Sequence, residues 1–265
     1  MNAEDRRKYI LEKLNVQESI SISDICGELS MSLPTVRNDF DVLEKSGKII
    51  RTFGGAILNR QNLGTETHDS TPKLMTYTNR TSRFHENKVK IGNLASTLVS
   101  DFDIVFLDAG TTVFEILDGI ISRKIEKLVV LTNSIYVGTY LMNVPDIIHY
   151  VMGGSINSFS MATIGYKTID EIKQNHVNKV FLGADGLAAD GFTVQDINEA
   201  MIKRAMIDIA AEKYLLVDSS KIKNPTFIEV AKFDVLNAVI TENGIFHINK
   251  DNMEESIAAI NRQKV

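Results

Sequence analysis

The chain has 265 residues with 29 Lys and Arg against 34 Asp and Glu, and its formal net charge is −5. Its 44% hydrophobic content excludes a wholly disordered chain. No apolar run reaches the length of about 18 residues that a membrane-spanning helix needs, and the polar first residues argue against a signal peptide. We therefore expect a soluble cytoplasmic protein. The single cysteine, Cys26, excludes an intrachain disulfide bond and zinc sites of the CxxC type, and the five histidines show no HxxxH spacing, so we expect neither a metal nor a cofactor.

Residues 1–57 predict three helices followed by a short β-hairpin. A hydroxyl residue followed three positions later by an acid, over residues 21–24, is typical of the start of a helix. A third helix is expected from Pro34, which suits a first turn because its missing N–H is not needed there, to a cap at Gly47. Residues 48–56 are rich in β-forming residues on both sides of a turn. Three helices with a small hairpin make a winged helix-turn-helix domain.

The third helix has the pattern of a DNA-recognition helix. Val36, Phe40 and Leu43 mark its buried side, so its polar side chains fall on the opposite side, where they can enter the major groove. Hydroxyl and amide groups there suit phosphates and base edges, an arginine suits guanine or a phosphate, and cations in the hairpin suit phosphates. The predicted DNA-binding residues are Ser32, Thr35, Arg37, Asn38, Lys48 and Arg51. The same shape also occurs in protein-interaction modules, whose polar face is merely solvated.

The rest of the chain predicts a linker and a second domain. Residues 58–85 lose periodicity and carry Gln, Asn, Thr and Ser, so they are predicted to be a linker. In residues 86–265, short apolar runs alternate with amphipathic helices, which is the pattern of a mostly parallel sheet covered on both faces. The predicted strands are 104–107, 128–131, 147–151, 180–182, 214–217 and 238–240. The expected fold is therefore an N-terminal winged helix-turn-helix domain followed by a C-terminal α/β domain.

Polar residues and glycines follow five of these apolar runs, and the carboxyl ends of parallel strands line the ligand crevice of an α/β sheet. Glycines and hydroxyls at a strand-to-helix turn suit a phosphate, as does a lysine, whereas Asp and Asn side chains offer acceptors to sugar hydroxyls. The turn at 108–112 lacks the GxxxxGK pattern of a nucleotide-binding loop, and alone it is equally consistent with an ordinary capped helix. Together the residues favour a sugar phosphate. The predicted effector-binding residues are Asp108, Gly110, Thr111, Thr112, Thr132, Asn133, Ser134, Gly153, Gly154, Asp185, Gly186 and Lys221.

Short motifs spread over nearly the whole chain carry a family resemblance. The N-terminal motifs are residues 7–14, 23–29, 35–40, 43–47 and 51–56. The C-terminal matches are Glu86, Lys88, 108–112, 132–134, Gly153, Gly154, 183–186, Gly191, Lys203 and 218–221. In this order they resemble the DeoR family of bacterial regulators, whose sensor domain is similar to sugar-phosphate isomerases related to ribose-5-phosphate isomerase. Asn38 stands where that family usually has a second arginine, so the operator sequence of other members does not carry over.

The resemblance implies a one-component transcription factor that binds double-stranded operator DNA and a phosphorylated sugar. We expect a repressor of a carbohydrate-metabolism operon, controlled by that sugar. Because helix-turn-helix proteins commonly read two half-sites, we expect a homodimer or a homotetramer. Met75, Tyr77, Ile257 and Ile260 are expected in the core rather than at a subunit interface.

Two alternatives stay open. The first is an isomerase-like enzyme with an accessory helix-turn-helix module, since carboxylates and a lysine in one cleft can move protons. The isomerases carry a lysine after an acidic segment, whereas Asp185 and Gly186 lead into residues 187–192 without one, so we expect no enzyme activity. The second alternative is a regulator whose C-terminal domain no longer binds a ligand and serves only for assembly.

Overall fold

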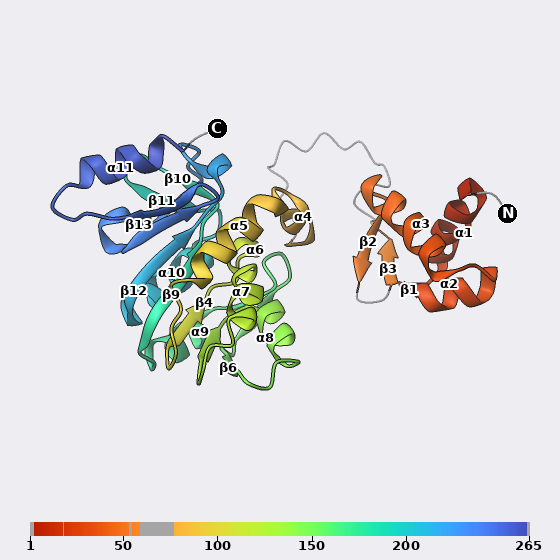
Figure 1. Ribbon diagram of the computed structural model, residues 1–265, viewed down its shortest axis with the longest axis horizontal. Coiled ribbons are helices and arrows are strands. Elements are labelled where there is room, and N and C mark those ends of the chain that lie inside the picture. The colour runs from red at the N-terminus through yellow and green to blue at the C-terminus, as the bar shows by residue number, and fades with distance from the viewer. Residues whose placement is uncertain (1–2, 18, 53–54, 59–76, 264–265) are drawn as a thin grey trace. The chain divides into compact units, whose positions relative to one another are not determined.

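The computed structural model describes residues 3–17, 19–52, 55–58 and 77–263 (Figure 1). The chain divides into two compact units, Met1–Lys73 and Leu74–Val265. Among the helices that the structure describes, none is long and apolar enough to span a bilayer.

The described part of the N-terminal unit combines three helices with a three-stranded antiparallel sheet of order β1-β3-β2. Its elements are α1 (Ala3–Val16), β1 (Ser19–Ser21), α2 (Ile22–Leu29), α3 (Leu33–Lys45), β2 (Ile49–Thr52) and β3 (Gly55–Leu58). This is the winged helix-turn-helix that the sequence predicts. The short strand β1, which extends the hairpin, was not predicted.

Local signals set the helix ends in this unit. Ser21 Oγ accepts a hydrogen bond from the backbone N–H of Asp24 at 3.0 Å and so caps α2, as predicted. Ser32 stands at the N-cap position of α3, but its hydroxyl bonds the hydroxyl of Thr35 at 2.8 Å. Gly47 follows α3 with φ of 69°, a left-handed conformation that favours glycine, as expected of a C-terminal cap.

The C-terminal unit is built around a large sheet whose described strands follow the order β15-β14-β12-β9-β4-β5-β6. Its helices are α4 (Tyr77–Ser82), α5 (His85–Ser96), α6 (Thr111–Phe114), α7 (Ile116–Ser122), α8 (Ile135–Leu141), α9 (Tyr166–Lys173), α10 (Ile197–Ile209) and α11 (Met253–Asn261), with short 3₁₀ turns at Ser219–Lys221 and Phe233–Val235. Its strands are β4 (Ile104–Leu107), β5 (Val129–Thr132), β6 (Ile148–Val151), β7 (Ser155–Asn157), β8 (Ala162–Ile164), β9 (Val177–Gly183), β10 (Gly186–Leu187), β11 (Gly191–Val194), β12 (Ala210–Leu216), β13 (Ile228–Lys232), β14 (Ala238–Thr241) and β15 (Gly244–His247).

The expected parallel sheet is present. Strands β4, β5, β6, β9, β12 and β14 pair in parallel and correspond to the six predicted strands, while β15 joins one end antiparallel. Apolar side chains of α5 to α8 pack on one face of this sheet, and those of α9 to α11 pack on the other. Burial on both faces explains why the strands read as continuous apolar runs. The antiparallel sheet β10-β11-β13 and the hairpin β7-β8 were not predicted.

The sheet ends in two unlike edges. Strand β15 contacts α5 and α11, whereas β6 contacts α8 through the face that carries Val151, next to Gly138. Side chains alternate along a strand, so Ile148 and Tyr150 point to the other face, where they are 57% and 58% exposed. Among the described strands, none pairs with the outer side of β6, so this edge presents apolar side chains and backbone hydrogen-bonding groups to solvent.

The described part of the predicted linker contains a helix. Tyr77 opens α4, is buried and stacks on Tyr136 with ring centroids 4.2 Å apart. Residues 77–85 are therefore part of the second unit, and the sequence missed this because α4 is too short to show periodicity. Ile260 is buried and Ile257 packs beside it, as expected of core residues. Met75 and the remaining predicted linker, residues 59–76, lie outside the described residues.

Candidate functional site

The outer surface of α3 carries the predicted DNA-contacting groups. Val36, Phe40 and Leu43 are buried, as expected for the inner side of the helix. The predicted residues divide by exposure, with Ser32, Arg37, Asn38 and Lys48 exposed and Thr35 and Arg51 half-buried. The helix thus offers hydroxyl, amide and guanidinium groups of the kinds that contact phosphates and base edges.

Arg51 has partners within its own unit. Its Nη1 lies 3.1 Å from Asp41 Oδ1, and its guanidinium lies 5.3 Å from the centre of the Phe40 ring. These contacts join β2 to α3. The predicted phosphate contact of Arg51 stays a prediction, and a phosphate would have to share this guanidinium with Asp41.

A buried ion pair that sequence reasoning missed joins α1 to α3. Arg6 Nε donates to Asp39 Oδ2 at 2.6 Å, and Arg7 Nε lies 3.8 Å from Oδ1 of the same carboxylate. Asp39 is 1% exposed, next to the apolar inner face of α3. An acid at an inner-face position beside Val36 and Phe40 is the sequence signal that could have revealed this pair.

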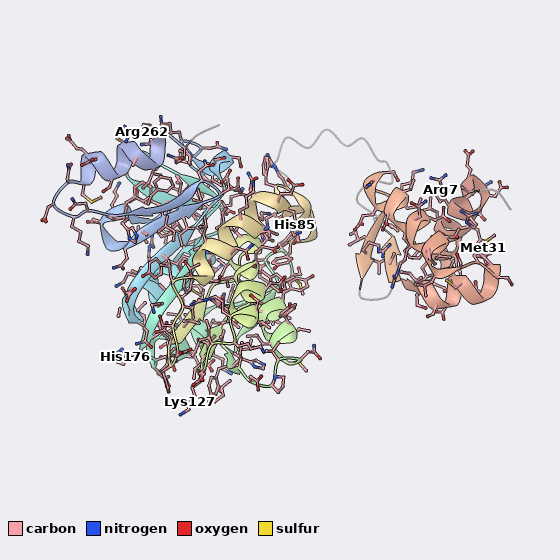
Figure 2. All side chains as sticks on the ribbon, viewed as in Figure 1. Arg7, Met31, His85, Lys127, His176 and Arg262 are labelled. Carbon is pink, nitrogen blue, oxygen red and sulfur yellow. The ribbon has the colours of Figure 1, made fainter. Side chains whose placement is uncertain are left out.

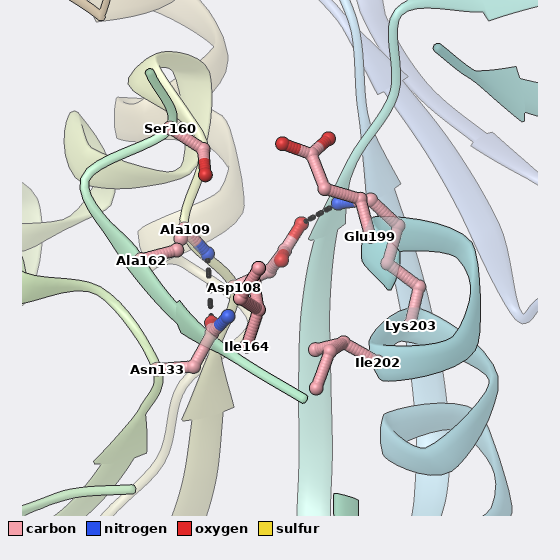
Figure 3. Close-up of a pocket in the computed structure, with 9 residues that line it drawn as sticks. All are labelled: Asp108, Ala109, Asn133, Ser160, Ala162, Ile164, Glu199, Ile202 and Lys203. Atoms are coloured by element: carbon pink, nitrogen blue, oxygen red, sulfur yellow. Dashed lines mark hydrogen bonds and ion pairs between the residues drawn. The ribbon is translucent and has the colours of Figure 1, made fainter. Parts of the chain in front are cut away.

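A pocket in the C-terminal unit lies at the topological switch point of the sheet, where the chain order reverses between β4 and β9. Ligand crevices in open α/β sheets form at this point, beyond the carboxyl ends of the strands. The lining residues are Asp108, Ala109, Asn133, Ser160, Ala162, Ile164, Glu199, Ile202 and Lys203 (Figure 3). Of the predicted effector-binding residues, the pocket brings together Asp108 and Asn133.

Asp108 is fixed at the floor of this pocket by two partners. Its Oδ2 accepts the backbone N–H of Gly183 at 2.8 Å, which spans the switch point, and it pairs with the ammonium of Lys203. Both side chains are buried. Burial alone would lower the pKa of Lys203, but the carboxylates of Asp108 and Glu199 more than compensate and hold the pKa above its ordinary value. Lys203 therefore stays charged and neutralises Asp108.

The residues that follow β5 shape the pocket wall. Asn133 Oδ1 accepts the N–H of Ala109 at 3.2 Å, and its Nδ2 donates to the carbonyl of Thr163 at 3.2 Å. Thr132 Oγ1 donates to the carbonyl of Leu107 at 2.6 Å, and Ser134 Oγ caps α8. Each of these predicted side chains thus has an internal hydrogen bond, and those of Thr132 and Asn133 hold neighbouring segments together.

Three cations, Arg80, Lys88 and Lys221, lie close enough for the charges of Arg80 and Lys221 to act on Lys88 in α5. Lys88 is buried and donates to the backbone carbonyl of Arg80. Burial lowers the pKa of Lys88 to about 8, and the ammonium of Lys221 adds to the shift while Asp218 opposes it. Arg80 Nη2 donates to the carbonyl of Phe159 at 3.4 Å, and its Nε has no hydrogen-bond partner among the described residues. Of these cations, the sequence predicted Lys221 alone as a binding residue.

Four further predicted residues lie at turns that follow β4 and β9. Gly110 is the N-cap of α6, which Thr111 and Thr112 begin. Asp185 Oδ2 accepts the N–H of Gln195 at 3.0 Å, and its Oδ1 lies 3.8 Å from Arg80 Nη1.

The predicted glycines lie where the chain packs closely. The N–H of Gly153 donates to Glu171 Oε2 at 2.6 Å. Gly154 adopts φ of 148°, and a Cβ there would lie 2.0 Å from Thr168 Oγ1. A Cβ on Gly186 would lie 2.0 Å from the backbone oxygen of Asn224. Close approach of side chain or backbone explains the glycines at Gly154 and Gly186, whereas a Cβ on Gly153 would meet only the flexible end of Glu171 at 3.3 Å.

Sequence reasoning placed only Asp108 and Asn133 of the nine lining residues in the site, and two of the residues that it missed, Ser160 and Glu199, carry polar groups facing the pocket. Ser160 is 2% exposed, and its Oγ has no hydrogen-bond partner in the described structure. Glu199 lies in the first turn of α10, and desolvation raises the pKa of its carboxyl although Lys203 opposes the shift. Ser160 comes from the hairpin that was not predicted, and Glu199 gives no signal beyond that of any acid on an amphipathic helix.

The described residues contain no group of three or more His, Cys, Asp or Glu that could hold a metal ion. His85 and His176, for example, lie far apart in the C-terminal unit (Figure 2).

Both units match models of one protein family. The model of the DeoR-like helix-turn-helix domain matches residues 6–62, and that of the DeoR C terminal sensor domain matches residues 83–243. The HTH-type transcriptional repressor GlcR of Bacillus subtilis is 33% identical over 242 residues, which are 91% of this chain and 89% of the relative. The lactose phosphotransferase system repressor of Lactococcus lactis is 30% identical over 246 residues, 92% of this chain and 93% of the relative.

Solved structures with a similar chain path have low sequence identity. Ribose 5-phosphate isomerase A from Methanocaldococcus jannaschii is 19% identical with a TM-score of 0.38, over 52% of this chain and 54% of that one. The translation initiation factor eIF-2B of Pyrococcus horikoshii is 17% identical with a TM-score of 0.47, over 64% and 67%. The two matching models and the two relatives instead identify the protein: the chain belongs to the DeoR family of DNA-binding transcriptional regulators.

Proposed function

We propose that the chain is a repressor of a carbohydrate-metabolism operon and that a phosphorylated sugar controls its binding to double-stranded operator DNA. The sugar phosphate binds in the crevice of the C-terminal unit, and α3 enters the major groove. Two relatives that are named as repressors support this direction of control. A cytoplasmic location follows from a role on DNA.

The observation that carries the proposal is the group of cations close to a hydrogen-bonding pocket. Lys88 is buried near Lys221, and its ammonium bonds a backbone carbonyl rather than a carboxylate. Among the described residues, no carboxylate forms a hydrogen bond with Lys88, and the only carboxylate that pairs with Arg80 is that of Asp185, at 3.8 Å. A dianionic phosphate would add the missing counter-charge. Arg80 connects the two regions, because its side chain contacts Asp185 and the segment before Ser160. Sugar hydroxyls would then occupy the pocket of Figure 3.

Control requires that the ligand bind two arrangements of the protein with different affinity, since a ligand shifts an equilibrium only by that difference. Release from the operator follows when the arrangement with the tighter crevice is the one that binds DNA less well. The protein acts as a homodimer or homotetramer in this proposal, and the exposed apolar edge of β6 supports self-association.

Thermal melting of the full chain with glucose 6-phosphate, fructose 6-phosphate, fructose 1-phosphate, ribose 5-phosphate and inorganic phosphate tests the sensor. A ligand at 100 times its Kd should stabilise the protein by about 2.7 kcal/mol. The same ligand should lower binding to a fluorescent fragment of the chain's own promoter, and Lys221→Ala should reduce that response. If the protein folds but none of these compounds stabilises it, the result would favour the alternative in which the C-terminal domain binds no ligand and serves only for assembly.

The isomerase alternative is tested separately. Asp108 is a poor candidate for a general base, because its carboxylate is already held by Lys203 and the N–H of Gly183. Glu199, with its raised pKa, is the better-suited carboxyl. A coupled assay for interconversion of aldose and ketose phosphates should show no turnover, and measurable turnover would reverse the assignment.

A further inference from the structure

The pocket contains two polar groups that the described residues leave without hydrogen-bond partners. Ser160 is almost completely buried, yet its hydroxyl is unpaired. The Glu199 carboxylate likewise accepts no hydrogen bond from the described residues, although Lys203 and Arg80 are near enough to act on it electrostatically. Buried polar groups in folded proteins are nearly always paired, so the buried, unpaired hydroxyl of Ser160 points to a ligand group in this pocket. The half-buried carboxylate of Glu199 lines the same pocket with acceptor oxygens that no described residue bonds.

Both residues are held on well-defined backbone. The side chain of Asn157 accepts the N–H of Phe159 at 2.9 Å and that of Ser160 at 3.4 Å, which fixes the turn between β7 and β8. Asp196 caps α10 and accepts the N–H of Glu199 at 3.3 Å. Figure 3 shows Ser160 and Glu199 at the same end of the pocket, on either side of Asp108.

The chemistry of the pair specifies the group that it would bind. Ser160 can donate or accept a hydrogen bond, while an ionised Glu199 only accepts. An alcohol hydroxyl donates to the carboxylate and accepts from the serine, so it satisfies both groups. A second phosphate is disfavoured, because it would meet the negative charges of Glu199 and Asp108 in a poorly solvated pocket.

We propose that Ser160 and Glu199 form a hydroxyl-recognition subsite that selects sugar monophosphates over inorganic phosphate and over bisphosphates. The inference rests on the proposed sensor function and adds the basis of its selectivity. The phosphate is held by Arg80, Lys88 and Lys221, and the hydroxyl end of the sugar lies between Ser160 and Glu199. A site built to bond a hydroxyl rejects ligands that lack it, because its own polar groups are then left unpaired.

Isothermal titration calorimetry on the full chain tests the subsite with Ser160→Ala, Glu199→Gln and the control Glu254→Gln, an exposed acid on α11. The tightest binder among glucose 6-phosphate, fructose 6-phosphate, fructose 1-phosphate and ribose 5-phosphate is compared with inorganic phosphate. The two pocket variants should bind that sugar phosphate at least about tenfold more weakly, with affinity for inorganic phosphate within about twofold of wild type. Fructose 1,6-bisphosphate should bind wild type more weakly than the monophosphate.

Stability provides a second readout. Ser160→Ala removes an unpaired buried hydroxyl, so it should raise the melting temperature of the unliganded protein even as it weakens ligand binding. If Ser160 had a purely structural role, Ser160→Ala would instead lower the melting temperature of the unliganded protein.

Equal losses for the sugar phosphate and inorganic phosphate, or unchanged affinity in both variants, would overturn the subsite while leaving the sensor function intact. Failure of wild type to bind any of the sugar phosphates would overturn both.

Discussion

Lys88 holds an ammonium group in surroundings that favour the neutral amine. Burial and the nearby charge of Lys221 lower its pKa to about 8, so at pH 7 the side chain is still mainly charged. The charge is costly in the empty protein and becomes favourable once an anion lies beside it. In the proposed sensor, Lys88 would therefore couple phosphate binding to protonation in the range just above neutral pH.

We expect the affinity for a sugar phosphate to fall as pH rises above about 8, because Lys88 then loses its proton and the phosphate loses a counter-charge. Calorimetric titrations from pH 7 to about 9.5 measure the decline. Lys88→Gln should bind more weakly at pH 7 and show a much flatter profile, since its amide does not titrate. A decline of equal size in Lys88→Gln would assign the pH dependence to another group.

Arg37 is exposed on the outer side of α3, where a guanidinium can reach a guanine edge or a phosphate. Arg37→Ala should weaken operator binding about tenfold or more while the response to sugar phosphate is retained. Fluorescence anisotropy at fixed salt is the measurement, because phosphate contacts make affinity depend on salt. Lys8→Ala, which changes an exposed cation on α1, is the control. Equal affinities for Arg37→Ala and wild type would count against placing α3 in the groove.

Single residues differ in how far the sequence reveals them. Asp108 and Asn133 directly follow apolar strands, and the topology of parallel sheets brings such positions together, so the sequence predicts them in the pocket. Ser160 and Arg80 reach the same region from a short hairpin and a short helix. Their roles depend on tertiary packing, for which no periodic pattern exists in the sequence.

At the scale of elements, the pairing of Arg6 with Asp39 sets the packing of α1 on α3. Asp39→Asn should destabilise the N-terminal unit by about 3 kcal/mol, because it leaves the Arg6 charge buried without its carboxylate. Urea unfolding followed by circular dichroism measures the effect, and Glu44→Gln, an exposed acid on the same helix, is the control. Equal stability of the two variants would show that the ion pair does not support the packing of these helices.

The β6 edge is the element we expect to mediate self-association. Tyr150 is 58% exposed on an end strand, and Tyr150→Lys would bring like charges together when two such edges meet. Sedimentation velocity should show a shift toward smaller species in this variant. Phe227→Lys, at a side chain 88% exposed just before β13, should leave the association state unchanged. Tyr150→Lys that sediments as wild type would assign the interface to another surface.

Elements with strong patterns were predicted, and those without were not. The parallel strands are visible because both faces are buried, which makes runs such as Ile104–Leu107 continuously apolar. Strand β7, with the sequence Ser-Ile-Asn, has neither the length nor the composition of a predictable strand. The same holds for the two-residue strand β10, which exists because β11 pairs with it.

On the scale of the whole molecule, the division into a DNA-binding part and an α/β part was legible in the sequence, because the periodicity of the pattern changes between them. The boundary between the linker and the second unit was harder to predict from the sequence. Residues 77–85 read as linker but belong to the second unit, since Tyr77 is buried against Tyr136. A buried aromatic ring shows in the sequence only as one tyrosine among polar neighbours.

The short helix α4 contacts the pocket region and also begins directly after the segment between the two units. Its Arg80 touches the segment that carries Ser160, while its first residue, Tyr77, immediately follows the stretch leading back to the amino-terminal unit. In the proposed function, a phosphate bound by Arg80 would therefore act on the helix that opens the described part of the second unit.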